Sequence, residues 1–321
     1  MLSESFRVDR LAVPDVIAGP VDVVLDTDTF NEIDDQFAIV YAYLSPDRIN
    51  LEAIYAAPFK NDRSSSPGEG MELSYDEIQR VLERLGDAEG CPVRRGSDRW
   101  MDSDEDVVES EAVQDLIERA ENRRRDDSPL YVVAIGAPTN VASALVKRPE
   151  IREKVVVVWL GGHPHHWPTQ AEFNLAQDDV ASRTLFDSGV PFVRVPCRTV
   201  AQALRTTPAE MRDALSDGSP VEAFLLERFL AYEGYEVPRR VGWNGGRPIA
   251  YGKEIWDLGP IAWLVDPSWT QSHLRSSAIL QRDLTLSQDL RRHQVRELTE
   301  IDRDAVFGDL FTKMRHLRGL G

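Results

Sequence analysis

The stretch VDVVLDTDTFNEIDD, from Val21 to Asp35, decides the fold of this 321-residue chain. Its first part is a mostly apolar run typical of a buried strand. Within the next ten residues come four aspartates, Asp26, Asp28, Asp34 and Asp35. Carboxylates this close raise one another's pKa, so the cluster is stable when a bound cation neutralises it or some members stay protonated. Ligands that are all oxygen favour calcium or magnesium over zinc.

Short apolar runs recur along the chain, and each predicts a buried strand. They cover residues 21–25, 51–57, 131–135, 155–160 and 191–195. Segments with helical periodicity separate them, at residues 34–44, 74–85, 111–122, 140–146 and 179–188. This alternation predicts an α/β fold with a single large open, mainly parallel sheet and helices on both faces. Ligands of such sheets bind beyond the carboxyl ends of the strands, where the aspartates begin.

The chain length permits one large domain or two smaller ones, and we expect a single domain over residues 1–321. Three segments, residues 60–70, 96–110 and 232–252, have the composition of loops or lids and are too short to be linkers. The charged stretch at residues 281–303 is expected to form a solvated helix and tail.

The formal net charge is −17, from 37 basic and 54 acidic residues. This charge repels phosphate backbones and anionic lipids, so we expect no nucleic acid and no membrane surface as a partner. The two cysteines, Cys91 and Cys197, are far apart and form no disulfide framework. The start of the chain lacks a signal-peptide pattern, and no apolar run approaches the roughly 18 residues of a membrane span. We therefore expect a soluble, cytoplasmic protein that binds a small neutral or cationic ligand.

Two further motifs carry polar side chains suited to a binding site. AEFN at residues 171–174 places a carboxylate and an amide two residues apart, where they can hold neighbouring hydroxyls. The pair Asp178 and Asp179 follows and opens a predicted helix. Farther along, Asp257 lies in an apolar, helix-like run at residues 253–267. A buried carboxylate in such a run needs a partner, and a metal ion is one.

In this order and at this separation, the three motifs resemble the nucleoside hydrolase family. The resemblance spans most of the chain and includes GAPTN at residues 136–140 and the strand at residues 155–162, which ends in a glycine pair. It implies an enzyme that cleaves the N-glycosidic bond of ribonucleosides to free base and ribose with a bound calcium ion. It also implies a homodimer or homotetramer.

The resemblance also implies a role for individual residues. Asp28 would ligate calcium and take the proton from the attacking water, with Asp26 in support. The other implied calcium ligands are Asp35, Asp257 and the backbone carbonyl near Ile135. The implied ribose ligands are Asp34, Asn61, Glu172 and Asn174, with Glu172 at the 5′-hydroxyl end. The chemistry agrees, because carboxylates around the sugar suit an oxocarbenium-like transition state attacked by an activated water.

One departure from the family pattern is the turn at residues 29–33, which is two residues longer than the common turn containing Pro and Gly. Asn31 and Glu32 are therefore candidates to enter the site, and a longer turn can re-aim Asp34.

A second departure is Trp256, which stands where many pyrimidine-accepting members carry a His thought to protonate the departing base. Purine-preferring members have a Trp at this place, and a stacked aromatic face raises the proton affinity of the base, so that solvent can protonate it. We therefore expect a leaning toward purines. Trp100 and Trp243 are candidates for the opposite face of the base or for packing.

Three histidines, His163, His165 and His166, flank a proline and match no common zinc pattern. We interpret them as loop residues at the mouth of the site, where one is a candidate to touch substrate.

Other interpretations stay open at this point. Asp34 or Asp35 can cap a helix, although a cap needs only one carboxylate. The DxD start also suggests a magnesium-dependent phosphohydrolase of the haloacid dehalogenase type with Asp26 as nucleophile. Phe30 stands where that motif has Thr or Val, and the acidic chain offers little basic grip for phosphate. A third alternative is a non-catalytic family member that only binds a ribosylated ligand, which the longer turn at residues 29–33 favours.

Overall fold

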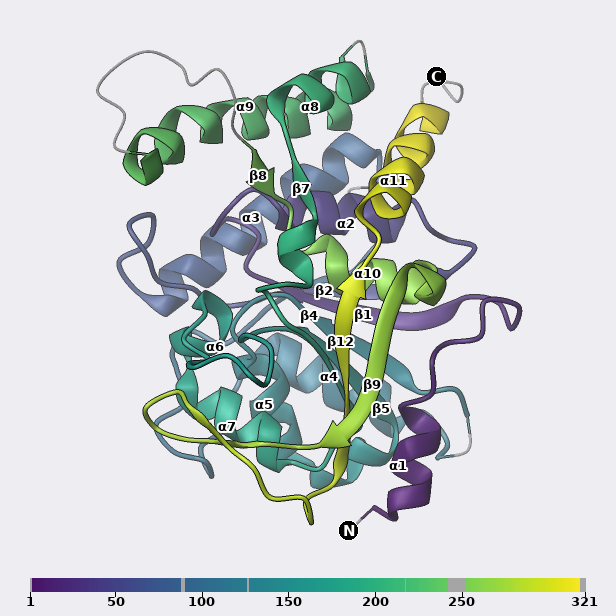
Figure 1. Cartoon of the computed structure of the whole chain (residues 1–321), viewed down its shortest axis with the longest axis vertical. Coiled ribbons are helices and arrows are strands. Elements are labelled where there is room, and N and C mark those ends of the chain that lie inside the picture. The colour runs from purple at the N-terminus through teal and green to yellow at the C-terminus, as the bar shows by residue number, and fades with distance from the viewer. Residues whose placement is uncertain (1, 88–89, 126, 217, 242–251, 318–321) are drawn as a thin grey trace.

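An open sheet forms the centre of the computed structural model, which describes residues 2–87, 90–125, 127–216, 218–241 and 252–317 (Figure 1). The strand order in this part of the chain is β3-β2-β1-β4-β5-β6-β12-β9. All neighbouring strands are parallel except β12 and β9, which are antiparallel. The strands are β1 (Val21–Thr27), β2 (Ile49–Ala56), β3 (Val93–Arg95), β4 (Leu130–Ala134), β5 (Val155–Leu160), β6 (Phe192–Val195), β9 (Thr270–Ser276) and β12 (Gln294–Ile301).

Helices cover both faces of the sheet, and each face has its own apolar core. On one face lie α2 (Asp35–Tyr43), α3 (Pro67–Leu85), α8 (Pro208–Leu215), α9 (Pro220–Val241), α10 (Leu258–Val265) and α11 (Arg303–Leu317). On the other lie α4 (Glu111–Glu121), α5 (Thr139–Lys147) and α7 (Asp179–Asp187). Because β4 and β5 are covered on both sides, every residue of these strands is buried, which explains their unbroken apolar sequences.

Short elements complete the description of the fold. The small helices are α1 (Glu4–Arg10), α6 (Phe173–Gln177) and the 3₁₀ turns η1 (Pro149–Glu153), η2 (Ala201–Ala203) and η3 (Pro267–Trp269). Two antiparallel pairs lie outside the main sheet: β7 (Arg205–Thr206) with β8 (Lys253–Glu254), and β10 (Ile279–Leu280) with β11 (Leu286–Ser287). Within the described residues, no helix is both long and apolar enough to cross a membrane.

The predicted α/β class with a mainly parallel sheet and helices on both faces is confirmed. The prediction for residues 281–303 is wrong, because this stretch contains β11 and the internal strand β12. The lid predicted at residues 232–252 is also wrong as far as residue 241, which ends α9, and residues 242–251 lie outside the described residues. The loop predicted at residues 60–70 ends early, because Ser66 caps α3 and Pro67 begins it. The single domain stays a prediction.

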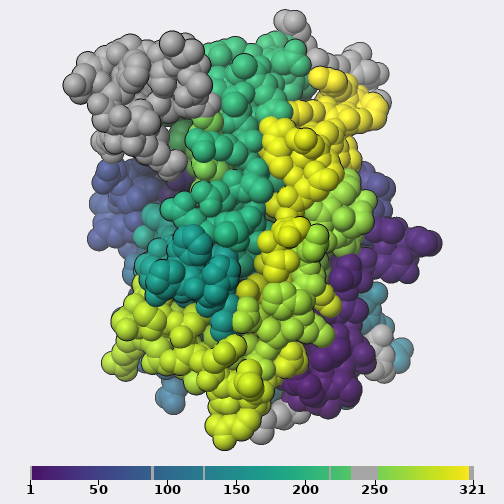
Figure 2. Space-filling model, viewed as in Figure 1, coloured from purple at the N-terminus to yellow at the C-terminus, as the bar shows by residue number. Residues whose placement is uncertain are grey.

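The first helix of the chain lies against the C-terminal strands, as Figure 2 shows where purple and yellow-green surfaces meet. The backbone N–H of Gln294 donates to the Glu4 carboxylate at 2.8 Å, and Arg296 Nε donates to the Leu11 carbonyl at 2.6 Å. These bonds hold α1 and the residue after it against β12.

A buried ion pair joins β6 to β12. Arg194 Nη1 lies 2.7 Å from Glu297 Oε2, and both side chains are at most 4% exposed. Glu297 also accepts from Arg275 on β9 at 2.8 Å. The second guanidinium nitrogen of Arg194 donates to the His163 carbonyl at 2.9 Å and to Gln170 Oε1 at 3.0 Å. The ion pair thus also fixes the loop that follows β5.

We expect Glu297→Gln to lower the free energy of unfolding by about 3–5 kcal/mol, because it leaves the buried Arg194 charge uncompensated. Urea unfolding followed by circular dichroism measures this change. The matched control is Asp289→Asn, which removes the partner of the exposed Arg291 and should leave stability unchanged. Equal effects of the two substitutions would contradict the role given to the buried pair.

Candidate functional site

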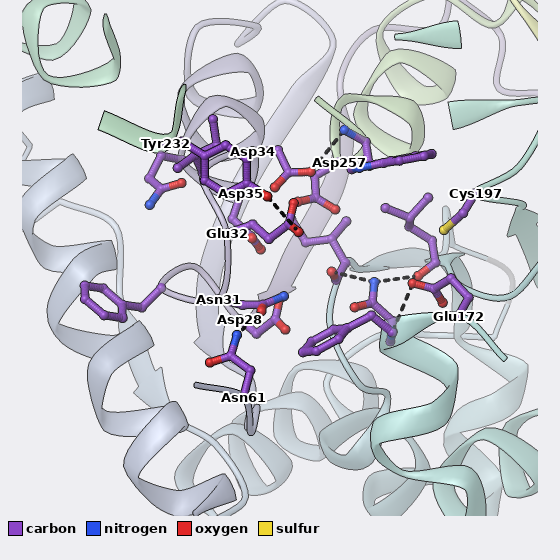
Figure 3. Close-up of a pocket in the computed structure, with 18 of the residues that line it drawn as sticks. Asp28, Asn31, Glu32, Asp34, Asp35, Asn61, Glu172, Cys197, Tyr232 and Asp257 are labelled. Atoms are coloured by element: carbon purple, nitrogen blue, oxygen red, sulfur yellow. Dashed lines mark hydrogen bonds between the residues drawn. The ribbon is translucent and has the colours of Figure 1, made fainter. Parts of the chain in front are cut away.

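A pocket opens where the strand order reverses. The chain builds β2 and β3 on one side of β1 and then places β4 on the other side. Ligands of open parallel sheets bind at such a switch point, beyond the carboxyl ends of the strands. A pocket of about 860 Å³ lies there and is lined by residues that follow β1, β2, β4, β5 and β6, together with residues of α9 and the turn before α10 (Figure 3).

Three aspartates converge on one side of this pocket. One carboxylate oxygen from each of Asp34, Asp35 and Asp257 lies within 4.8 Å of the other two, and Figure 3 shows these side chains together. Asp34 holds the cap position of α2 without a capping bond, and its Oδ2 instead accepts the Trp256 N–H at 3.0 Å. Asp35 accepts from the Thr27 hydroxyl at 2.5 Å. The capping role considered for Asp34 is therefore replaced by a contact across the pocket.

Asp28 lies in the same pocket, directly after β1. Both of its carboxylate oxygens are buried and have no hydrogen-bond partner. Burial, and then the charges of Asp35 and Asp34, hold its pKa well above the ordinary value. Gly136 makes room for this side chain, because a Cβ at that position would lie 3.1 Å from Asp28 Cγ.

The donor set fits a hard cation. Burial raises the pKa of Asp34 to about 6 and that of Asp35 to about 7, and it raises the pKa of Asp257 well above the ordinary range. Neighbouring carboxylates add to the shift of Asp257, since Asp34, Asp35 and Asp28 all surround it. A divalent cation bound by oxygen ligands would offset this repulsion, and calcium accepts six to eight of them. Within the described residues, three or more potential metal ligands converge only here.

The opposite side of the pocket is built on AEFN. Glu172 caps α6 and accepts the backbone N–H groups of Asn174 at 3.0 Å, Leu175 at 3.2 Å and Gly162 at 2.8 Å. The Asn174 amide donates to the Ile135 carbonyl at 2.9 Å and to the Leu160 carbonyl at 3.0 Å. The structure therefore brings Glu172, Asn174 and Ile135 to the pocket. The Glu172 carboxylate already accepts backbone N–H groups, and the Asn174 amide already donates to the Ile135 carbonyl.

The long turn after β1 also enters the pocket. Asn31 and Glu32 both line it, as the additional length of the turn suggests. Asn61 Nδ2 donates to Asn31 Oδ1 at 2.8 Å, while the Asn31 N–H donates to the Asp28 carbonyl at 2.7 Å. Glu32 forms an ion pair with the buried Lys253. The extra residues are thus fixed at both ends rather than looped out.

Aromatic side chains surround the acidic cluster. Trp256 lines the pocket and packs on the core at its back. Trp100 does not line the pocket, and Trp243 lies outside the described residues. Sequence reasoning missed the other aromatic lining residues, which are Phe30, Phe173 and Tyr232. Phe30 and Phe173 adjoin recognised motifs, and this proximity was the available signal for them. Tyr232 begins the segment at residues 232–252 with the composition of a lid, but no motif marked it as a pocket residue.

Other lining residues belong to loops without a recognisable motif. Among the three histidines, His163 lines the pocket, whereas His165 points its backbone N–H toward Glu297 at 3.4 Å. Cys197 and Arg198, directly after β6, also line the pocket and were not predicted. Asp26 does not line it, because this residue belongs to β1 and its buried side chain accepts from Asn140 Nδ2 at 2.7 Å.

The sequence matches a family model described as "Inosine-uridine preferring nucleoside hydrolase" over residues 23–308. Among curated relatives, the pyrimidine-specific ribonucleoside hydrolases RihA of Klebsiella pneumoniae (strain 342) and Enterobacter sp. (strain 638) are each 30% identical over 147 residues. These stretches cover 45% of this chain and 45% and 44% of the two relatives. The match thus spans about half the length of either relative.

Solved structures with the same fold cover nearly the whole chain. A purine-preferring ribonucleoside hydrolase from Gardnerella vaginalis has a TM-score of 0.70 and 21% identity, covering 94% of this chain and 100% of that one. A plant nucleoside hydrolase has a TM-score of 0.71 and 20% identity, covering 92% and 99%. The type III effector XopQ, solved with adenosine diphosphate ribose, has a TM-score of 0.66 and 19% identity, covering 98% of each chain. At such identities the likeness establishes the fold alone.

In chelator, we expect the free energy of unfolding to fall as the pH rises from about 4 to about 7. The buried carboxyls of Asp34 and Asp35 keep their protons in the folded state up to pKa values of about 6 and 7, whereas the unfolded chain loses them near 4. The loss per carboxyl is on the order of a few kcal/mol. Urea unfolding at pH 5 and pH 8 with EDTA measures it.

Calcium added at pH 8 should raise the melting temperature, because only the folded chain assembles the cluster. Asp257→Asn should flatten the pH dependence and abolish the calcium effect. Stability that rises between pH 5 and pH 8 in EDTA would contradict the raised pKa values.

Proposed function

Because the chain belongs to the family of inosine-uridine preferring nucleoside hydrolases, we propose that it hydrolyses the N-glycosidic bond of ribonucleosides to free base and ribose. One observation carries the proposal. Asp28 presents two buried, unpartnered carboxylate oxygens beside the converging side chains of Asp34, Asp35 and Asp257. A group placed in this way can hold and deprotonate a water next to a bound cation.

The residues have distinct roles in this proposal. Asp28, Asp35, Asp257 and the backbone carbonyl of Ile135, which all line the pocket, would hold a calcium ion. Asp34 converges with Asp35 and Asp257 and could join them. Calcium bound there would neutralise the carboxylates and lower the pKa of the attacking water. Asp28 takes the proton of that water. Asn174 positions the Ile135 carbonyl through its 2.9 Å hydrogen bond.

The reaction joins the water oxygen to C1′ of the ribose and breaks the bond from C1′ to the base nitrogen. The base leaves with the electron pair and takes a proton from solvent. Asp34, Asn61, Glu172 and Asn174 would contact the ribose, where hydrogen bonds to its hydroxyls strengthen as positive charge develops on the ring. The surrounding carboxylates stabilise that charge electrostatically.

Trp256 is the proposed contact for the base. It lines the pocket beside Asp257, and its backbone N–H is fixed by Asp34 at 3.0 Å. The larger face of a purine gains more from stacking on an indole than a pyrimidine does. The RihA relatives are named pyrimidine-specific, so the purine leaning of this chain rests on Trp256 alone. A cytoplasmic location, a role in purine salvage and a homo-oligomer also stay proposals.

The phosphohydrolase alternative has little support, because Asp26, its required nucleophile, lies outside the pocket lining. A binding-only protein would retain the acidic cluster and show no turnover. Both alternatives are separated from the hydrolase by the tests that follow.

Asp28→Asn should lower kcat for ribonucleoside hydrolysis by about 10²–10⁴-fold, because the amide cannot accept the proton of the attacking water. Release of reducing sugar from adenosine, inosine, uridine and cytidine, with calcium and with chelator, measures it. The control is Asp283→Asn on the β10–β11 connection, which does not line the pocket, and this variant should keep full activity. Calcium binding without turnover in the wild type would support the binding-only alternative, and phosphate release that depends on Asp26 would support the phosphohydrolase.

Trp256→Ala should raise KM or lower kcat/KM for purine nucleosides by about tenfold, since stacking on an aromatic side chain is worth about 1–3 kcal/mol per base. Trp256→Phe should retain part of the stacking energy and therefore lose less kcat/KM for purine nucleosides than Trp256→Ala does. The readout is the ratio of kcat/KM for inosine over uridine in each variant. A wild type that prefers uridine, with a ratio unchanged in Trp256→Ala, would overturn the stacking role.

A further inference from the structure

Two residues of the pocket have no role in the reaction as proposed, and they lie at the same side of it. His163 follows β5 and Arg198 follows β6, and both line the pocket. Their sequence neighbours, Gly162 and Cys197, belong to a chain of hydrogen bonds that ends at Glu172. The Gly162 N–H donates to the Glu172 carboxylate at 2.8 Å, and the Cys197 N–H donates to the Gly162 carbonyl at 3.0 Å. The two loops are therefore bonded together beside Glu172.

His163 offers an unused polar atom. It is 8% exposed, and its Nδ1 is buried without a hydrogen-bond partner. Its backbone is held firmly, because its N–H donates to Gln170 Oε1 at 2.9 Å and its carbonyl accepts from Arg194 at 2.9 Å. Burial and the charge of Arg198 lower its pKa, although backbone hydrogen bonds with Gly162 and Ala171 act the other way. A lowered pKa favours the neutral ring, which carries a single N–H.

Arg198 is exposed, and its guanidinium makes no hydrogen bond or ion pair with the described residues. The other two arginines of the pocket are engaged, because Arg63 donates to the Phe30 carbonyl at 3.1 Å and Arg228 donates to Glu77 at 3.1 Å. An unpaired cation is notable in a chain with a net charge of −17.

The backbone at Arg198 is held in an unusual conformation. Thr199, the next residue, has a φ of 66°, a left-handed value that β-branched residues rarely adopt. The Val200 N–H donates to the Arg198 carbonyl at 2.8 Å, which stabilises this turn. Strain of this kind is concentrated at binding sites, where the surrounding structure maintains it. Here the left-handed conformation of Thr199 sets the direction of the loop that follows β6 and carries Arg198.

We propose that Arg198 and His163 form a subsite for a phosphate group on the 5′-oxygen of the ribose, so that nucleoside 5′-phosphates are preferred over nucleosides. The inference rests on the proposed function and on the resemblance, which implies that Glu172 lies at the 5′-hydroxyl end of the ribose. Glu172 already accepts three backbone N–H bonds, which leaves it one acceptor site for a ribose hydroxyl. A guanidinium binds phosphate oxygens bidentately, and a neutral imidazole adds one N–H.

The phosphate takes no part in bond breaking. Water still joins C1′ and the base still leaves from C1′, so the products are free base and ribose 5-phosphate. Both a nucleoside monophosphate and a nucleoside diphosphate carry the group that the subsite recognises, and the two are tested separately.

The experiment measures kcat/KM for adenosine, its 5′-monophosphate and its 5′-diphosphate. We divide kcat/KM for each phosphate by kcat/KM for adenosine in the same variant. This ratio cancels effects of the substitution on folding and on the reacting groups. We expect a ratio above about tenfold in the wild type, and a ratio lower by about 10–100-fold in Arg198→Ala, since hydrogen bonds to charged groups are the strong ones. Arg198→Lys should keep part of the preference, and His163→Phe should lower the ratio several-fold.

Arg282→Ala is the matched control, because Arg282 is also exposed, lies outside the pocket and changes the net charge equally. It should leave the ratio unchanged. A wild-type ratio at or below one, or equal ratios in Arg198→Ala and Arg282→Ala, would overturn the subsite while leaving nucleoside hydrolysis intact. A preference for the diphosphate over the monophosphate would identify the longer group as the ligand.

If neither adenosine nor its phosphates are hydrolysed, the proposed function fails and calorimetry decides the subsite. Binding of adenosine 5′-monophosphate that is tighter than binding of adenosine, and that loses this advantage in Arg198→Ala, would support the subsite. Equal binding of the two compounds would overturn it.

Discussion

Mutual repulsion among buried carboxylates at the carboxyl end of β1 constrains the rest of the molecule. Asp28, Asp34, Asp35 and Asp257 come from two regions more than 200 residues apart in the chain, and all four line one pocket. Several groups reduce their repulsion without removing it, among them the Thr27 hydroxyl, the Trp256 N–H and the nearby charge of Lys253. Such an arrangement is unfavourable as a purely structural element, and a bound cation would stabilise it.

The architecture around the cluster gives each part of the site a separate support. The switch point between β1 and β4 provides the opening, and the two apolar cores hold the strands that flank it. The loop after β5 is held by Arg194, whose charge is balanced by Glu297 on β12. The polar groups proposed to contact ligand therefore lie on short loops, and the strands of the sheet fix the positions at which those loops begin.

The sequence was most informative where burial is complete. The strand β5 was predicted at residues 155–160 to the residue, because both of its faces are covered and no polar residue interrupts it. The resemblance to nucleoside hydrolases was likewise confirmed, since the aspartate motifs that carry it are local and dense. β12 was missed because Arg296 and Glu297 look solvated in sequence, and their partners, the Leu11 carbonyl and Arg194, are far away along the chain. No local pattern contains that information.

The same limit applies to the site. Asp28, Asp35 and Asp257 were found from local motifs, and they line one pocket. Arg198 was missed, because what distinguishes it is the lack of a partner, which only the fold reveals. The capping alternative for Asp34 also needed the fold, since its carboxylate contacts Trp256, far along the chain, instead of its own helix.

The position of β12 in the sheet has a consequence for biosynthesis. This strand follows every other strand in chain order, yet it lies inside the sheet between β6 and β9. Until it docks, the buried Arg194, which anchors the loop that carries His163, has no counter-ion from β12. During synthesis, β1 to β6 can therefore pair before the pocket is complete. Assembly of the site then reports that translation has passed residue 301, so a prematurely terminated chain would expose an unfinished sheet edge to cellular proteases.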